Sequence, residues 1–91
     1  MPGSRRAELT AELRILPERG GAAVPKEQVS AGERAAAESG LAREGGPDVT
    51  LLAGKQDEVL DALRRTVEAA LDAGAQAVEV RVEAERDAGR F

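Results

Sequence analysis

The stretch DEVLDALRRTVEAALDAGAQAVEVRVEA, residues 57–84, decides the fold because its hydrophobic period changes partway along it. Up to Gly74 the apolar residues recur at steps of three and four, which lays one apolar stripe along an α-helix. After Gly74 valines alternate with charged residues, the pattern of a strand with one buried face. The sequence therefore predicts a helix that is capped by Asp57, ends at Gly74 and leads into a strand over 78–84. The predicted inward stripe of this helix consists of Leu60, Leu63, Val67, Ala70 and Leu71, with Val59 beside it.

The preceding residues predict three more strands and one more helix. An alternation that is stopped by Pro17 indicates a half-buried strand, and Pro25 suits the first turn of a helix that ends at Gly40. A nearly continuous apolar run before the second helix favours a strand in the centre of the sheet. These predicted elements span residues 7–15 (strand), 26–39 (helix), 41–44 (strand) and 49–53 (strand).

The resulting order is βαββαβ. Two strand–helix–strand units of similar size interleave into one four-stranded antiparallel sheet with both helices on one face. This is the ferredoxin-like α+β sandwich, with the first and third strands central and the second and fourth at the edges. We expect a single domain over residues 1–91, with an ordered core over about 7–87.

Composition excludes several classes of site. The absence of cysteine removes disulfides, thiolate zinc sites and thiol nucleophiles, and the absence of histidine removes the usual acid–base group at neutral pH. A net charge of −4 and a single aromatic residue, Phe91, argue against nucleic-acid binding. No apolar run approaches the roughly 20 residues of a membrane span, so we expect a cytoplasmic protein without a membrane partner. No nucleophile has a base beside it, so we expect no enzymatic activity.

The helix over 26–39 has a thin inward stripe, made of Val29, Gly32, Ala36 and Gly40. Small residues allow a helix to pack close to its sheet. The other interpretation is a mobile helix that settles when a ligand binds beside it, because so little apolar area is buried. Gly32 costs the helix about 1 kcal/mol relative to alanine.

The sheet face away from the helices is expected to carry charges of both signs from the first and last strands. Such a face is either solvated or in contact with the sheet of another subunit. Carboxylates near the end of the chain alternate with Arg81 and Arg86, which indicates a self-neutralised strand face more simply than a site for hard cations. These carboxylates belong to Glu79, Glu83, Glu85 and Asp87.

Three segments carry motifs that recur together in a known family. Residues 10–17, TAELRILP, run through an Ala-Glu pair to an apolar–apolar–Pro end. A second set follows at fixed distances: SGL at 39–41, GP at 46–47 and TLLAG at 50–54. The third is the stretch over 57–84, followed by the charged Glu85-Arg86-Asp87. In order and spacing these segments resemble the thiamine-binding protein family, long classed as a domain of unknown function, over about residues 8–87.

The resemblance implies a ferredoxin-like domain that assembles into dimers or tetramers and binds thiamine or its hydroxymethylpyrimidine portion, without a cofactor and without catalysis. Carried over by position, the ligand-binding residues would be Glu12, Gly46, Pro47 and Thr50. A carboxylate and a hydroxyl near backbone amides could hydrogen-bond an aminopyrimidine, and an acidic surface suits a cationic thiazolium. The family commonly carries aromatic residues where this chain has Ala42-Arg43 and Glu79.

A second class of function stays open beside ligand binding. In it the chain is an oligomeric structural or interaction domain whose sheet face and edge strands meet other subunits. Any pocket would then be vestigial or would serve a different ligand.

Overall fold

The computed structural model describes residues 8–21, 23–45 and 49–84 of the 91-residue chain. Its elements are β1 (Leu9–Ile15), α1 (Lys26–Ser39), β2 (Ala42–Arg43), β3 (Val49–Gly54), α2 (Gln56–Asp72) and β4 (Val78–Ala84). All six predicted elements are present, and their ends differ from the predicted ones by two residues at most. The predicted strand start at Ala7 and the residues 46–48 lie outside the described part of the chain.

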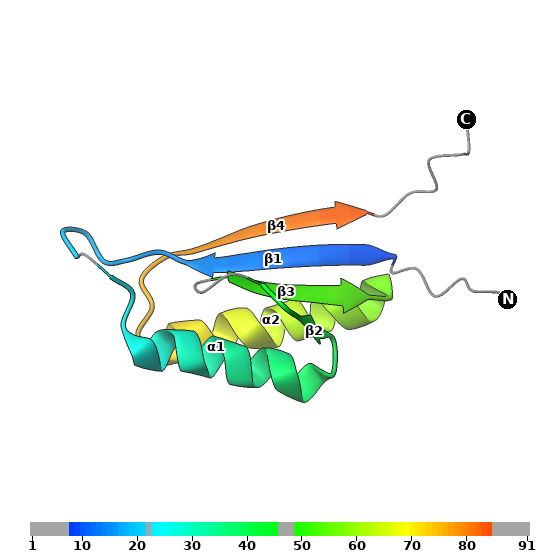
Figure 1. Cartoon of the computed structure of the whole chain (residues 1–91), viewed down its shortest axis with the longest axis horizontal. Helices are drawn as coiled ribbons and strands as arrows, with labels where there is room; N and C mark the ends of the chain where they lie inside the picture. The colour runs from blue at the N-terminus through cyan, green and yellow to red at the C-terminus, as the bar shows by residue number, and fades with distance from the viewer. Residues whose placement is uncertain (1–7, 22, 46–48, 85–91) are drawn as a thin grey trace, which may run out of the picture.

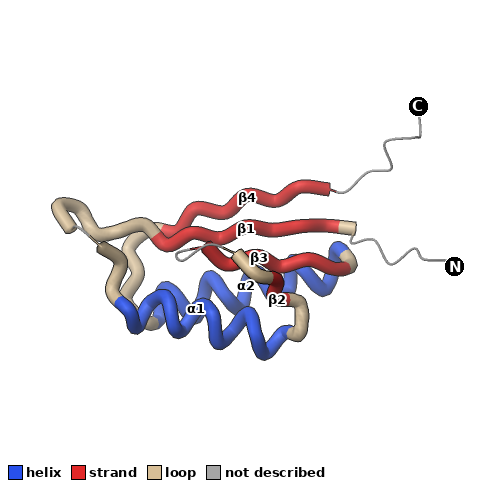
Figure 2. The backbone as a smooth tube through the Cα atoms, viewed as in Figure 1, coloured by secondary structure: helices blue, strands red, loops and turns tan. Residues whose placement is uncertain are grey.

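The four strands form one antiparallel sheet in the order β2-β3-β1-β4. Both helices lie on the same side of this sheet, and the strands form a separate layer that runs roughly along the helices (Figures 1 and 2). As predicted, β1 and β3 are central, and β2 and β4 are the edges. The order of elements and of strands confirms the ferredoxin-like α+β fold.

The core is centred on β1 because the alternation of this strand turns every second side chain toward the helices. These side chains are at most 6 % exposed and belong to Leu9, Ala11, Leu13 and Ile15. Leu52 of β3 and Val59 of α2 are completely buried in the same cluster. Burial of one such leucine stabilises the fold by about 1.5–3 kcal/mol, so this small set of side chains holds the two layers together.

Both ends of α1 follow from single residues. Pro25 occupies the N-cap position without a side-chain hydrogen bond, and its restricted φ suits the entry into a helix. At the other end Gly40 has a φ of +77°, the left-handed conformation that glycine adopts without a steric penalty. The helix bounds predicted from these two residues are confirmed.

The inward side of α1 is as poor in large side chains as predicted. Gly32 and Ala36 are buried there, together with Gln28, which the sequence reasoning did not place in the core. Val29 is only half-buried, and Gly40 is exposed. The thin stripe therefore lets α1 lie close to its neighbours, which supports the interpretation of close packing.

The buried side of α2 is rotated from the predicted one. It consists of Val59, Ala62, Leu63, Thr66 and Ala70. Leu60 and Leu71, both predicted to point inward, are 44 % and 48 % exposed, so the prediction is wrong for these two leucines. The reason is that α2 packs against α1 as well as against β1 and β3. The buried side of α2 is the one that faces both α1 and the sheet. This side is centred on small side chains and not on the largest ones.

The start of α2 also differs from the prediction. The helix begins at Gln56, whose backbone N–H donates a hydrogen bond of 3.1 Å to Oε1 of Glu8. Asp57 is therefore inside the first turn, where its Oδ1 accepts a bond from the backbone N–H of Glu58. Gly74, with a φ of +106°, follows the helix as predicted. Neither helix in the described part of the chain is long and apolar enough to cross a membrane.

Candidate functional site

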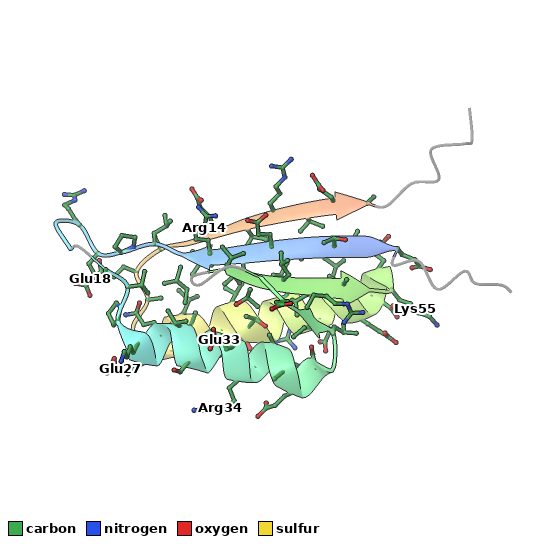
Figure 3. All side chains as sticks on the ribbon, viewed as in Figure 1. Arg14, Glu18, Glu27, Glu33, Arg34 and Lys55 are labelled. Atoms are coloured by element: carbon green, nitrogen blue, oxygen red, sulfur yellow. The ribbon has the colours of Figure 1, made fainter. Side chains whose placement is uncertain are left out.

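The sheet face that the helices do not cover, called the open face below, is built from three cross-strand rows. Residues directly opposite each other on neighbouring strands point to the same side, so the pairing of the strands defines the rows. They are Arg43–Leu51–Glu12–Arg81, Ala53–Thr10–Glu83 and Val49–Arg14–Glu79. Figure 3 shows Arg14 pointing away from the helix layer, where Glu33 and Arg34 lie. The open face is charged on β1 and β4 and apolar on β3.

Glu12 lies in the middle of the open face. It is on a central strand, opposite Leu51 of β3 on one side and opposite Arg81 of β4 on the other. Its side chain is 40 % exposed, and its Oε2 lies 3.7 Å from Nη2 of Arg14. The carboxylate is thus next to two arginine residues and to an apolar surface.

Two shallow hollows on the open face share Glu12 and Arg81. The larger has a volume of about 370 Å³ and is lined by Glu12, Arg14, Glu79, Val80 and Arg81. The other, of about 330 Å³, is lined by Thr10, Glu12, Leu51, Arg81 and Glu83. The Glu12–Arg81 pair therefore offers a hydrogen-bond acceptor and several donors to a molecule in either hollow.

The four predicted site residues do not gather in one place. Glu12 is on the open face, whereas Thr50 is opposite Leu13 of β1 and therefore on the side of the helices. The two side chains project from opposite faces of the sheet. Gly46 and Pro47 lie outside the described residues. Of the two that the structure describes, Glu12 lines both of these hollows and Thr50 lines neither.

Arg81 and Leu51 were not identified as site residues from the sequence. Both stand opposite Glu12, and this relation follows only from the register of three strands that are far apart in the chain. The interpretation of the last strand as self-neutralised agrees with a 2.9 Å ion pair between Arg81 and Glu83. Among the described residues, no cluster of acidic side chains is placed to hold a metal ion.

Comparison with known proteins agrees with this architecture. The family model described as "Thiamine-binding protein" matches residues 11–90. One solved structure, described as the structure of domain of unknown function DUF77 from Bacillus cereus, is similar over 97 % of this chain and 84 % of that one. The TM-score is 0.65 and the sequence identity is 24 %, so this likeness concerns the fold. No curated protein matches the chain.

The ferredoxin-like fold with one face left open, together with this match, defines a small-molecule-binding class of domain. The match covers most of the chain, from the β1 residue Ala11 onward. The chain belongs to the thiamine-binding protein family. This family is a family of binding proteins and is not known as a family of enzymes.

Proposed function

We propose that this chain binds thiamine, or the hydroxymethylpyrimidine portion of thiamine, on the open face and without catalysis. The observation that carries the proposal is the position of Glu12, a half-buried carboxylate that lines both hollows of that face. The larger hollow, at about 370 Å³, falls in the range of ~300–1,000 Å³ typical of small-molecule sites.

The chemistry around Glu12 favours the pyrimidine half of the ligand. The carboxylate accepts a hydrogen bond from an exocyclic amino group, and the guanidinium of Arg81 donates one to a ring nitrogen. Leu51, opposite Glu12 on β3, supplies apolar surface for the ring in a chain that has no aromatic residue before Phe91. The arginines beside Glu12 offset its charge, so the cationic thiazolium gains less there than on a purely acidic surface.

The proposal is tested by thermal unfolding with thiamine, its phosphates, hydroxymethylpyrimidine and the thiazole portion alone. At a ligand concentration of about 100 Kd, binding to the native state adds about 2.7 kcal/mol to the free energy of unfolding. We expect a clear rise in Tm with thiamine and with the pyrimidine, and none with the thiazole.

The variant Glu12→Gln keeps the shape of the side chain and removes its charge, so we expect it to lose most of the ligand-induced shift. Glu33→Gln makes the same change at an exposed position of α1, in the helix layer, and is the matched control. Equal shifts in wild type and in Glu12→Gln would contradict a site at Glu12. No shift at millimolar ligand, with folded protein, would contradict the ligand itself.

A second function, self-association as an interaction domain, is favoured by a separate observation. Leu60, Leu71, Val80 and Val82 are exposed to between 42 % and 48 % although each is apolar. Val80 also lines the larger hollow, so the two candidate functions share this residue.

A further inference from the structure

One carboxylate of the open face is left over when the ion pairs of this face are counted. Oε2 of Glu12 lies 3.7 Å from Nη2 of Arg14 on the same strand. Oε2 of Glu83 lies 2.9 Å from Nη2 of Arg81, also on the same strand. Glu79, the third acidic residue of the three rows, forms no ion pair with any residue that the structure describes. The neutralisation of the last strand that the sequence indicated is therefore incomplete at Glu79.

The arginines of the open face do not supply the missing positive charge. Arg14 stands directly opposite Glu79 on the neighbouring strand, yet its guanidinium is turned to Glu12. Arg43 is on β2, at the other edge of the sheet, with two strands between it and β4. Its Nη1 donates hydrogen bonds of 3.3 Å and 3.1 Å to the backbone carbonyls of the two residues before it. The negative charge of Glu79 is thus available to a ligand.

This carboxylate belongs to the larger hollow alone. Glu79 lines the hollow of about 370 Å³ and does not line the smaller one, whereas Glu12 lines both. Glu12 stands opposite Arg81, two residues after Glu79 on β4, so the two carboxylates are diagonal neighbours on the open face. Diagonal neighbours across an antiparallel pair are about 7–8 Å apart, a span that a single small ligand covers. The larger hollow therefore has a balanced charge at Glu12 and an unbalanced negative charge at Glu79.

We propose that Glu79 binds the cationic thiazolium ring of thiamine and so makes the site selective for the charged ligand over the pyrimidine alone. This inference rests on the proposed function, in which Glu12 and Arg81 hold the pyrimidine. The two rings of thiamine are joined through one carbon atom, so a pyrimidine at Glu12 places the thiazolium in the same hollow. An ion pair between exposed groups changes an equilibrium constant by about two- to fivefold, and this is the gain we expect from Glu79.

The composition of the chain favours a carboxylate for this task. Proteins also hold organic cations over the faces of aromatic rings, but this chain has no aromatic residue before Phe91. The attraction of a negative side chain is the remaining way to recognise the positive charge of the ring. The apolar Val80 lines the same hollow and offers contact to the uncharged part of the ring.

Titration calorimetry of the full chain with three ligands isolates the effect of the positive charge. The ligands are thiamine, hydroxymethylpyrimidine and the neutral analogue of thiamine in which carbon replaces the thiazolium nitrogen. The analogue keeps the shape of thiamine and lacks only its charge. We expect thiamine to bind about two- to fivefold more tightly than the analogue. This difference should shrink when salt is added, because salt screens exposed charges.

The variant Glu79→Gln assigns the effect to this residue. We expect it to bind thiamine only as tightly as the neutral analogue, with an unchanged affinity for hydroxymethylpyrimidine. The matched control Glu33→Gln, at an exposed position of α1, should keep the wild-type preference for thiamine.

Two results would overturn the inference and leave the ligand proposal standing. One is equal affinity of the wild type for thiamine and its neutral analogue, and the other is a preference for thiamine that persists in Glu79→Gln. If none of the three ligands binds to the folded wild type, the inference and the proposed function both fail.

Discussion

At the scale of single residues, Gly32 shows how closely the two helices lie. A Cβ built on this glycine would be 3.8 Å from Cγ2 of Thr66 on α2 and 3.9 Å from Cδ1 of Ile15 on β1. Both distances are ordinary van der Waals contacts, so there is room for one methyl group and for little more. An alanine therefore fits at position 32, in the middle of α1.

The first prediction concerns this position. Gly32→Ala should raise the free energy of unfolding by about 0.5–1 kcal/mol, because alanine loses less conformational entropy in a helix and its methyl group gains contacts. Urea unfolding measures the change. Gly40→Ala is the control, since its φ of +77° strains any residue with a Cβ and should lower the free energy of unfolding by about 1 kcal/mol. A destabilising Gly32→Ala would mean that α1 packs more tightly than these distances indicate.

Glu12 is the other decisive residue. Its place on the first strand predicts that it lies on the open face, but only the register shows that Leu51 and Arg81 flank it. Thr50, the other described residue of the predicted site, lies on the other side of the sheet. In an antiparallel pair a shift of one residue moves a side chain to the other face, and the residue opposite Thr50 is the buried Leu13.

At the scale of elements, the rotation of α2 has measurable consequences. The apolar stripe of this helix is wider than the arc that α1 and the sheet can cover. Leu63 is 9 % exposed and lies in the core, whereas Leu60, three residues earlier, is 44 % exposed. Two leucines that hydrophobic periodicity treats alike therefore contribute very differently to stability.

We therefore expect Leu63→Ala to lower the free energy of unfolding of the monomer by about 2–5 kcal/mol, through lost burial and the cavity that remains. Leu60→Ala should lower the free energy of unfolding of the monomer by less than about 1 kcal/mol. Denaturant unfolding at low protein concentration compares the two variants. Similar losses of unfolding free energy in the two variants would show that α2 buries Leu60, as the apolar periodicity predicts. At high concentration Leu60→Ala should weaken self-association, because Leu60 is one of the exposed apolar side chains.

At the scale of the whole molecule, two helices cover less than the full width of four strands. A chain of 91 residues buries a thin core, and uncovered apolar surface at one edge is a route to further stability through association. The side chains of the open face and those of Val80 and Val82 lie on opposite sides of the sheet. We propose that such a molecule binds a small ligand on one side of the sheet and associates with another copy through the other side.

A dimer makes thermal stability depend on concentration, because mass action favours the associated native state. We expect the Tm of the wild type to rise when the protein concentration is raised. The Tm of Val80→Lys should stay constant, because a charge at this exposed apolar position opposes self-association. Differential scanning calorimetry over a hundredfold range of concentration measures this. A Tm of the wild type that does not change with concentration would contradict self-association.

The sequence by itself determined the order of the elements and most of their bounds. Helical and strand periods are local properties, and Pro25, Gly40 and Gly74 mark helix ends through backbone conformations that depend on neighbouring residues alone. The alternation in β1 also predicted which of its side chains are buried, because a strand has only two faces.

Only the tertiary structure decided the rest. Which side of α2 is buried depends on two neighbours at once, and which residues surround Glu12 depends on the register of strands separated by dozens of residues. The exposure of Val80 and Val82 depends on how far the helix layer reaches beneath the sheet. Each of these is a relation between distant segments, and no local pattern of residues encodes it.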